Sequence, residues 1–136
     1  MKKLEKFILL FAIILFIDRI TKSFLSESCL SIFCIKKALN PGAAFGIFPY
    51  PATLILISAA VLIAIAYFWK IQKIRLALTL VAAGTAGNLL DRILYGKVID
   101  IFSIANSSSF NISDISNLVG ALLLIIYIVG KPSKSK

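Results

Sequence analysis

The sequence predicts a mainly α-helical membrane protein, a bundle of four transmembrane helices with a small extracytoplasmic β-element. Of its 136 residues 60% are hydrophobic and only 15% are charged, whereas soluble proteins average about 25% charged residues. Apolar runs such as 7–17 and 52–68 are too long to be hidden inside a soluble core of this size. We therefore expect residues 1–136 to form a single integral membrane domain.

Four windows approach the roughly 20 helical residues that are needed to cross a bilayer core. They lie near residues 4–23, 52–70, 75–94 and 114–131. The first window begins like a secretory signal peptide, with a charged start and an apolar middle. No A-x-A cleavage site follows it, which favours an uncleaved signal anchor over a removed leader.

A net charge of +9 is compatible with binding to nucleic acid. Whether the charge serves that purpose depends on where the basic residues lie in the sequence. Three clusters of three lie in segments that alternate along a four-pass topology: Lys2, Lys3 and Lys6; Lys70, Lys73 and Arg75; Lys131, Lys134 and Lys136. This is the pattern of cytoplasmic loops under the positive-inside rule. We expect both termini in the cytoplasm and no nucleic-acid partner.

Two longer segments, about 24–51 and 95–113, then lie on the outer side. The first contains short runs rich in Ile, Phe and Cys, broken at Asn40-Pro41-Gly42 and at Pro49, which is typical of strands joined by a turn. The second contains the strand-like run Val98–Phe102, followed by a turn at Asn106–Ser109. We expect a small β-element over the outer membrane face.

Cys29 and Cys34 fall in the first outer segment, where an oxidising compartment permits a disulfide. The alternative is two small, semi-apolar residues in a strand or loop. Their spacing without a histidine is not that of a zinc site.

The absence of histidine removes Ser-His-Asp and Cys-His mechanisms and most zinc hydrolase sites. Carboxylate chemistry remains, so we expect no metal and no cofactor. Ionisable groups at membrane depth are costly and indicate function, although groups at a helix end can reach the headgroups. Four aspartates lie near the outer ends of the expected helices: Asp18, Asp91, Asp100 and Asp114.

Two of these aspartates belong to local patterns that structure alone could explain. Asp18 and Lys22 are spaced i, i+4 and can pair on one helix face. Asn88, Asp91 and Arg92 share one face of the third helix, which should turn into the bundle or a wet cleft because contact with lipid is expensive. A polar packing cluster between helices is the alternative.

Asp114 follows Asn111 at the spacing of a helix N-cap and its N3 partner, so helix capping alone would explain it. Asp100, in the strand-like segment, could also face Asp114 across a cleft. Two carboxyl groups at that range share one proton, so one can take a proton from water while the other donates to an amide carbonyl. The spacing suggests such a dyad without establishing it.

Four motifs in order along the chain resemble those of lipoprotein signal peptidase, also called signal peptidase II. They are Asp18-Arg19-Ile20-Thr21-Lys22 (D-x-x-[ST]-K), Asn40–Gly46 (N-x-G-A-A-F-[GS]), Gly84–Arg92 (G-A-x-G-N-x-x-D-R), and Val98-Ile99-Asp100 with Phe110–Asp114 (V-x-D and F-N-x-A-D). Any one motif is weak, but four in register on one membrane face are specific. The resemblance spans nearly the whole chain.

The resemblance implies a metal-independent aspartic endopeptidase with four transmembrane helices and an outer β-cradle. Asp100 and Asp114 would be the catalytic pair. Residues implied to contact the substrate are Asn40, Gly42, Asn88, Arg92 and Asn111, and those implied to support the site are Asp18, Lys22 and Asp91.

The substrates that the resemblance implies are diacylglyceryl-modified prolipoproteins, cut on the amino side of the lipidated cysteine. The enzyme would be a multi-pass monomer among the lipids of the bacterial cytoplasmic (inner) membrane, with its active site at the outer face.

Three residues depart from the family pattern: Ser113 and Thr85 stand where Ala is usual, and Ile101 where Phe is common. Ser113 adds a hydroxyl that could donate a hydrogen bond to Asp114. A rival interpretation is a small four-helix multidrug transporter. Such a transporter requires an acidic residue near the bilayer midplane, and the interiors of the expected helices contain none. A noncatalytic membrane scaffold is a third.

Overall fold

The computed structural model describes residues 3–42, 50–104 and 109–130. Its long helices are α1 (Lys3–Phe24), α2 (Pro51–Phe68), α3 (Arg75–Tyr95) and α4 (Ile112–Val129), and a short 3-10 helix, η2 (Gln72–Ile74), leads from α2 into α3. The strands are β1 (Ser28–Leu30), β2 (Phe33–Asn40), β3 (Val98–Ile104) and β4 (Ser109–Phe110). The helix bounds lie within two residues of the expected windows.

Among the described residues, α2 and α4 are long and apolar enough to cross a membrane. Only three α2 side chains are buried, those of Leu54, Ser58 and Ile65, so most of this helix presents apolar side chains outward. Helices α1 and α3 are longer, with 22 and 21 residues, but carry more charged groups.

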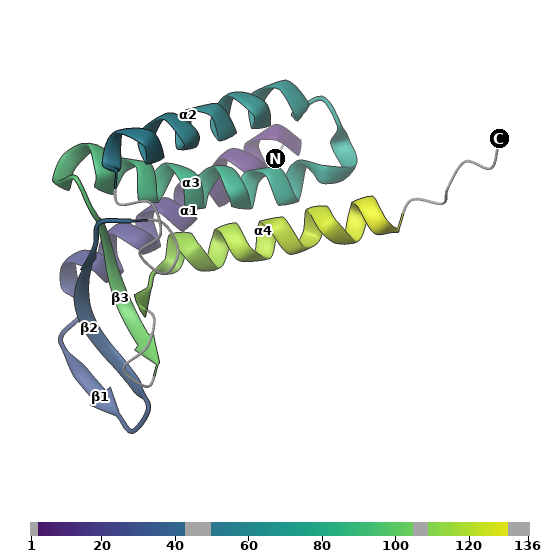
Figure 1. Ribbon diagram of the computed structural model, residues 1–136. Coiled ribbons are helices and arrows are strands. Elements are labelled where there is room, and N and C mark those ends of the chain that lie inside the picture. The colour runs from purple at the N-terminus through teal and green to yellow at the C-terminus, as the bar shows by residue number, and fades with distance from the viewer. Residues whose placement is uncertain (1–2, 43–49, 105–108, 131–136) are drawn as a thin grey trace.

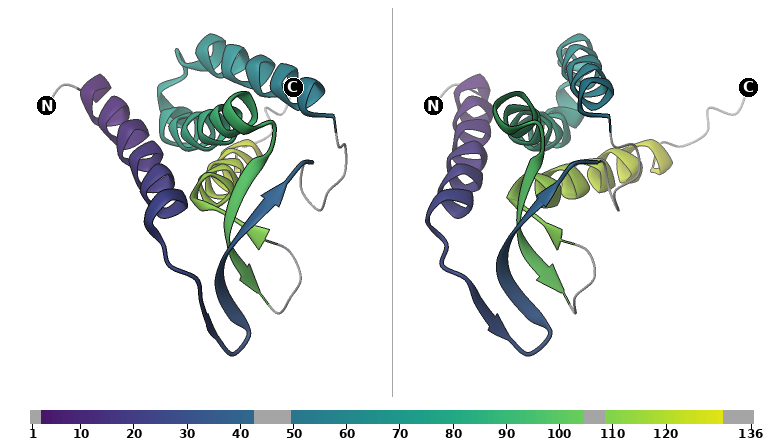
Figure 2. Two further views of the ribbon diagram at one scale, coloured as in Figure 1. Left: turned by 90° about the vertical axis from the view of Figure 1, so that its left-hand side faces the viewer. Right: turned by 60° about the vertical axis from the view of Figure 1, so that its left-hand side comes forward.

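Helix α3 packs against each of the other three long helices, so it forms the centre of the bundle (Figures 1 and 2). Glycines let α4 approach it closely. A Cβ on Gly84 would collide with the Ser113 carbonyl oxygen, and one on Gly120 would lie 2.6 Å from a Val81 methyl group. These small residues set the separation of α3 and α4 beside the site described below.

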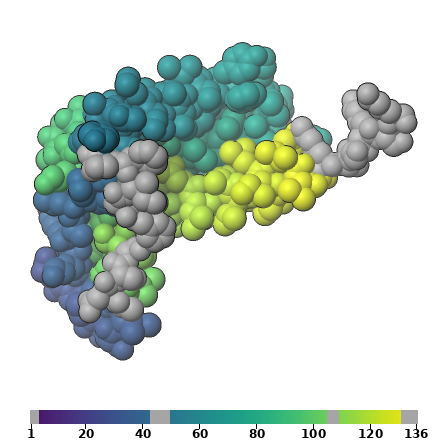
Figure 3. Space-filling model, in the orientation of Figure 1, coloured from purple at the N-terminus to yellow at the C-terminus, as the bar shows by residue number. Residues whose placement is uncertain are grey.

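The four strands form one antiparallel sheet in the order β1-β2-β3-β4, which projects from one end of the helix bundle (Figure 3). The break expected at Asn40-Pro41-Gly42 coincides with the end of β2, whose last residue Asn40 lies opposite Val98, and 43–49 lie outside the described residues. The β1–β2 turn, which was not expected, lies at Ser31-Ile32, where Ser31 adopts a φ of 55°. Of the turn expected at 106–109, Ser109 belongs to β4 and the rest lies outside the described residues.

Cys29 and Cys34 face each other across the β1–β2 hairpin and form a disulfide. The alternative that the sequence left open, two unlinked residues, is therefore not the arrangement found. The bond closes the part of the sheet farthest from the helices (Figure 1).

The start of α1, the α2–α3 connection and the end of α4 lie at the end of the bundle opposite the sheet (Figure 1). Lys70, Lys73 and Arg75 are in or beside that connection. The sheet, the end of α3 and the start of α4 meet at the other end, where the conspicuous polar residues gather.

Candidate active site

Strand β3 and the start of α4 bring Asp100 and Asp114 together around Asn111. The Asn111 side-chain nitrogen Nδ2 donates to Asp100 Oδ1 at 2.9 Å, and its backbone nitrogen donates to Asp114 Oδ2 at 3.1 Å. Asn111 therefore connects the two carboxyl groups. Asp100 is fully buried, whereas Asp114 is partly exposed, so one member of the pair is open to water.

Asn111 and Asp114 also form the capping box at the start of α4. The Asn111 side-chain oxygen accepts a hydrogen bond from the Asp114 backbone nitrogen at 2.9 Å, while the Asp114 carboxylate accepts from the Asn111 backbone. Capping fixes the orientation of both side chains, and the Asn111 amide nitrogen then reaches Asp100 of β3. The expected helix cap is confirmed, and it does not compete with a role in a dyad.

Asp100 Oδ2 has two further donors. The Ser109 hydroxyl lies at 2.9 Å and the Asn40 amide nitrogen at 3.3 Å. Asn40 is held in turn by the Gly42 backbone nitrogen, which donates to its Oδ1 at 3.1 Å. Ser109 was not predicted as a site residue, because only the pairing of β3 with β4 brings it to Asp100.

Helix α3 supplies the other wall of the site. Asn88 donates to Asp114 Oδ1 at 2.7 Å and accepts from Asn111 at 3.1 Å. The Arg92 guanidinium donates to the backbone oxygens of Asn88 and Gly42, both at 3.4 Å. The residues implied to contact substrate therefore surround the dyad, while Ala43–Gly46 of the same motif lie outside the described residues.

Beside this network lies a cluster of four charged side chains from α1 and α3. Lys22 contacts Asp18 and Asp91 at 2.8 Å each, and Arg19 contacts the same two carboxylates at 2.5 and 2.6 Å. The expected Asp18–Lys22 pair is present at i, i+4 on one face of α1, and both side chains are buried. Arg19 was missed because its partner Asp91 is 72 positions away.

The charged cluster reaches both members of the dyad through the backbone. Asp91 accepts from the Ile99 nitrogen, one residue before Asp100, and Asp18 accepts from the Ser113 nitrogen, one residue before Asp114. Both bonds are 3.1 Å long. The cluster thus holds the two segments that carry the paired aspartates.

The expectation for the Ser113 hydroxyl is wrong. It is buried without a hydrogen-bond partner among the described residues, so it does not donate to Asp114. It lies against Gly87, where an added Cβ would collide with it.

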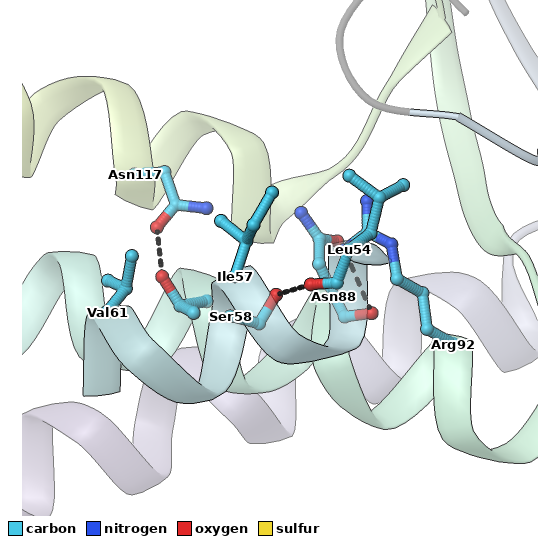
Figure 4. A pocket seen from close by; sticks show the side chains of 8 residues that line it. Leu54, Ile57, Ser58, Val61, Asn88, Arg92 and Asn117 are labelled. Atoms are coloured by element: carbon cyan, nitrogen blue, oxygen red, sulfur yellow. Dashed lines mark hydrogen bonds between the residues drawn. The ribbon is translucent and has the colours of Figure 1, made fainter. Parts of the chain in front are cut away.

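A cavity of about 230 Å³ opens beside Asn88 between α2, α3 and α4 (Figure 4). Its lining residues are Leu54, Ile57, Ser58 and Val61 of α2, Thr85, Asn88 and Arg92 of α3, and Asn117 of α4. The α2 wall is mostly apolar and the opposite walls are polar.

A sequence model of the family described as signal peptidase (SPase) II matches residues 10–130. The lipoprotein signal peptidase of Clostridium acetobutylicum is 33% identical, and the match covers 93% of this chain and 96% of that protein. The lipoprotein signal peptidase of Chlamydia trachomatis serovar D is 40% identical over 68% of this chain, which spans 62% of that longer protein.

A solved structure of a bacterial membrane enzyme, determined by the in meso method at 2.3 Å resolution, has a TM-score of 0.84 and 26% identity, covering 98% of this chain and 96% of that one. The resemblance seen in the motifs is therefore confirmed along nearly the whole chain. The chain belongs to the signal peptidase II family.

Proposed function

We propose that the chain is an intramembrane aspartic endopeptidase that removes signal peptides from prolipoproteins, with Asp100 and Asp114 as its catalytic residues. The observation that carries the proposal is the position of Asn111, which donates to both carboxylates at once. Membership of the signal peptidase II family and the names of the relatives supply the reaction class.

In this mechanism the two carboxyl groups share one proton, because two negative charges at close range cannot both persist cheaply. The ionised carboxylate takes a proton from a water molecule as the water oxygen attacks the scissile carbonyl carbon. The protonated partner donates to the carbonyl oxygen, which gives a tetrahedral diol. As the C–N bond breaks, the proton taken from water passes to the amine nitrogen and a diol hydroxyl returns its proton to the other carboxylate, so the dyad again holds one proton. No acyl-enzyme forms.

We propose that this chemistry needs no metal and no cofactor. The groups around the two carboxylates are amides and a hydroxyl, from Asn40, Asn88, Asn111 and Ser109, which orient carboxylates by hydrogen bonding. The chain contains no histidine that could act as base or metal ligand.

The proposed substrate is a diacylglyceryl-modified prolipoprotein, cut on the amino side of its lipidated cysteine. Asn40, Gly42, Asn88, Arg92 and Asn111 would position it. Arg92 is suited to this role because its guanidinium already donates to the carbonyl of Gly42, so it can also orient backbone carbonyls of a substrate lying along the same edge.

We propose that α1 and α3 cross the membrane together with α2 and α4, as one domain that acts as a monomer. Asp18, Arg19 and Lys22 of α1 form ion pairs among themselves and with Asp91 of α3, which lowers the cost of these charges in lipid. The 22 residues of α1 extend for roughly 33 Å, enough for a bilayer core. The basic α2–α3 connection would face the bacterial cytoplasm, as would both termini, and the sheet the outer side.

The test uses purified protein and a diacylglyceryl-modified precursor, with the unmodified precursor as control, and each reaction is run with and without a chelator. A gel shift with the modified precursor alone, and a product that begins at the lipidated cysteine, is the expected result. Absence of cleavage would favour the transporter or scaffold interpretation. Cleavage that chelation abolishes would contradict the metal-independent mechanism.

A further inference from the structure

The cavity beside Asn88 contains three polar side chains that the proposed reaction does not use: Ser58 of α2, Thr85 of α3 and Asn117 of α4 (Figure 4). Thr85 lies one helical turn before Asn88, and Asn117 one turn after Asp114. Both turns lead away from the sheet. These residues therefore form a second polar level, deeper in the helix bundle than the dyad.

We propose that Asn117 is a substrate-binding residue, whose amide holds the peptide backbone of the signal sequence on the membrane side of the scissile bond. This inference rests on the proposed function and adds to it a subsite for one chemical group, the backbone amide.

The Asn117 side chain is held in one orientation by α3. The Thr85 hydroxyl donates to its Oδ1 at 3.3 Å, and Gly84 leaves room for the carboxamide, since a Cβ there would lie 2.6 Å from that oxygen. The amide nitrogen, which carries two donor hydrogens, has no acceptor among the described residues. Figure 4 shows it directed away from the bond to Thr85.

Asn117 is only partly buried, but a substrate in the cavity would exclude water from its amide nitrogen. A donor left without an acceptor there would cost free energy, so a bound group that accepts its hydrogen bond would be favoured. The facing α2 wall carries Ser58, whose hydroxyl donates to the Leu54 carbonyl at 2.8 Å and keeps its own lone pairs available. The cavity thus offers a donor on α4 and an acceptor on α2.

A peptide unit matches this pair, because it presents one C=O and one N–H, whereas a lipid acyl chain presents neither. A signal sequence that is helical in the membrane also ends with up to four carbonyl groups that lack helical partners. Those carbonyls precede the cleavage site, and Asn117 lies about one helical turn from Asp114 on the side away from the sheet.

The competing explanation is that Thr85 and Asn117 only join α3 to α4. Ser116 provides the matched control, because its hydroxyl donates to the Leu80 carbonyl at 2.8 Å, also between α4 and α3, without lining the cavity. Ser116→Ala therefore removes an interhelical hydrogen bond and leaves the proposed subsite intact. Asn117→Leu removes the amide at similar volume, and Thr85→Val removes the group that orients it.

The experiment measures kcat/KM on diacylglyceryl-modified precursors in which one thioamide, a weaker acceptor than an amide, replaces each of the four peptide bonds before the scissile one in turn. With the wild-type protein we expect one position to lower kcat/KM by about three- to tenfold, the loss of one net hydrogen bond. Asn117→Leu should lower kcat/KM on the all-amide precursor by a similar factor and lose the sensitivity at that position. Ser116→Ala should keep both values.

An unchanged thioamide profile in Asn117→Leu would overturn the subsite while leaving the proposed function in place. If Asn117→Leu does not insert or fold, Thr85→Val is used in its place. The proposal expects Thr85→Val to show a smaller thioamide effect at the sensitive position than the wild type, and an unchanged effect would contradict the proposal. If neither the wild type nor Ser116→Ala cuts the all-amide precursor, the proposed function fails, and the subsite fails with it.

Discussion

Asp18 in α1 accepts a hydrogen bond from the backbone nitrogen of Ser113, which lies 95 positions later in the chain, at 3.1 Å. Ser113 directly precedes Asp114, so a buried carboxylate of the first helix fixes the start of the last one. Asp91 does the same for the segment that carries Asp100. The charged cluster therefore fixes the backbone on which the paired aspartates lie, although none of its side chains forms a hydrogen bond with Asp100 or Asp114.

Asp18→Asn and Asp18→Ala should separate the charge of Asp18 from its role as a backbone acceptor. Asparagine keeps a side-chain oxygen that can accept the hydrogen bond from Ser113, but it leaves Lys22 and Arg19 with only one carboxylate partner. Breaking a buried ion pair typically lowers the free energy of unfolding by about 3–5 kcal/mol. Both variants should therefore unfold at lower temperature in detergent. Only Asp18→Ala should also lose kcat, measured where the protein is folded. A wild-type kcat in Asp18→Ala would exclude the positioning role.

Asn111→Ser and Asn111→Ala should distinguish helix capping from the link between the aspartates. Serine is a good N-cap but is too short to reach Asp100, whereas alanine loses both functions and costs about 1 kcal/mol of stability. We expect both to lower kcat by roughly 100-fold, the scale of a misplaced catalytic group. Thermal unfolding and turnover are the measurements, and near-normal turnover in Asn111→Ser would show that the link is dispensable.

Ser113→Ala should stabilise the protein by about 1 kcal/mol, because it removes a buried hydroxyl that has no partner in the described part of the chain. Gly87→Ala should be strongly destabilising, since its Cβ would collide with that hydroxyl. Combining the two changes should recover part of the loss. Equal unfolding temperatures for Gly87→Ala and the double variant would contradict this packing.

Replacing both cysteines, Cys29→Ser with Cys34→Ser, should leave turnover near that of the wild type. Cys34 pairs with Ser103, while Asp100 pairs with Ala38 nearer the helices, so the hairpin tip does not position the dyad. Loss of so short a disulfide loop should cost roughly 2 kcal/mol. Turnover assays with and without reductant test this, and a large fall in kcat on reduction would assign the hairpin a part in catalysis.

The helices could be predicted from the sequence because long apolar runs have few alternatives in a chain of this length. The hairpin turn could not, since Ser31-Ile32 contains no Gly, Pro or Asn, and Ser31 adopts a positive φ that serine rarely favours. The Asn40-Pro41-Gly42 sequence does interrupt a secondary-structure element, because β2 ends at Asn40.

The seven residues expected to act on the substrate were identified from their motifs, and the structure brings them into one hydrogen-bonded network; their roles stay predictions. Local spacing could not find Arg19, Ser109 or Asn117. Arg19 and Ser109 depend on partners from other segments, and Asn117 belongs to no motif and has no charged neighbour at i, i+4. Only the packing of α1, α3 and α4 reveals what these side chains face.

The most direct test of the account compares Asp100→Asn, Asp114→Asn and the double variant in single-turnover cleavage of the diacylglyceryl-modified precursor. Groups that act as a unit give non-additive losses, so each single change should abolish detectable cleavage and the double change should be no worse. All three variants should remain inserted, with an unfolding temperature near that of the wild type or above it. Substantial cleavage by either single variant would contradict the paired-carboxyl mechanism.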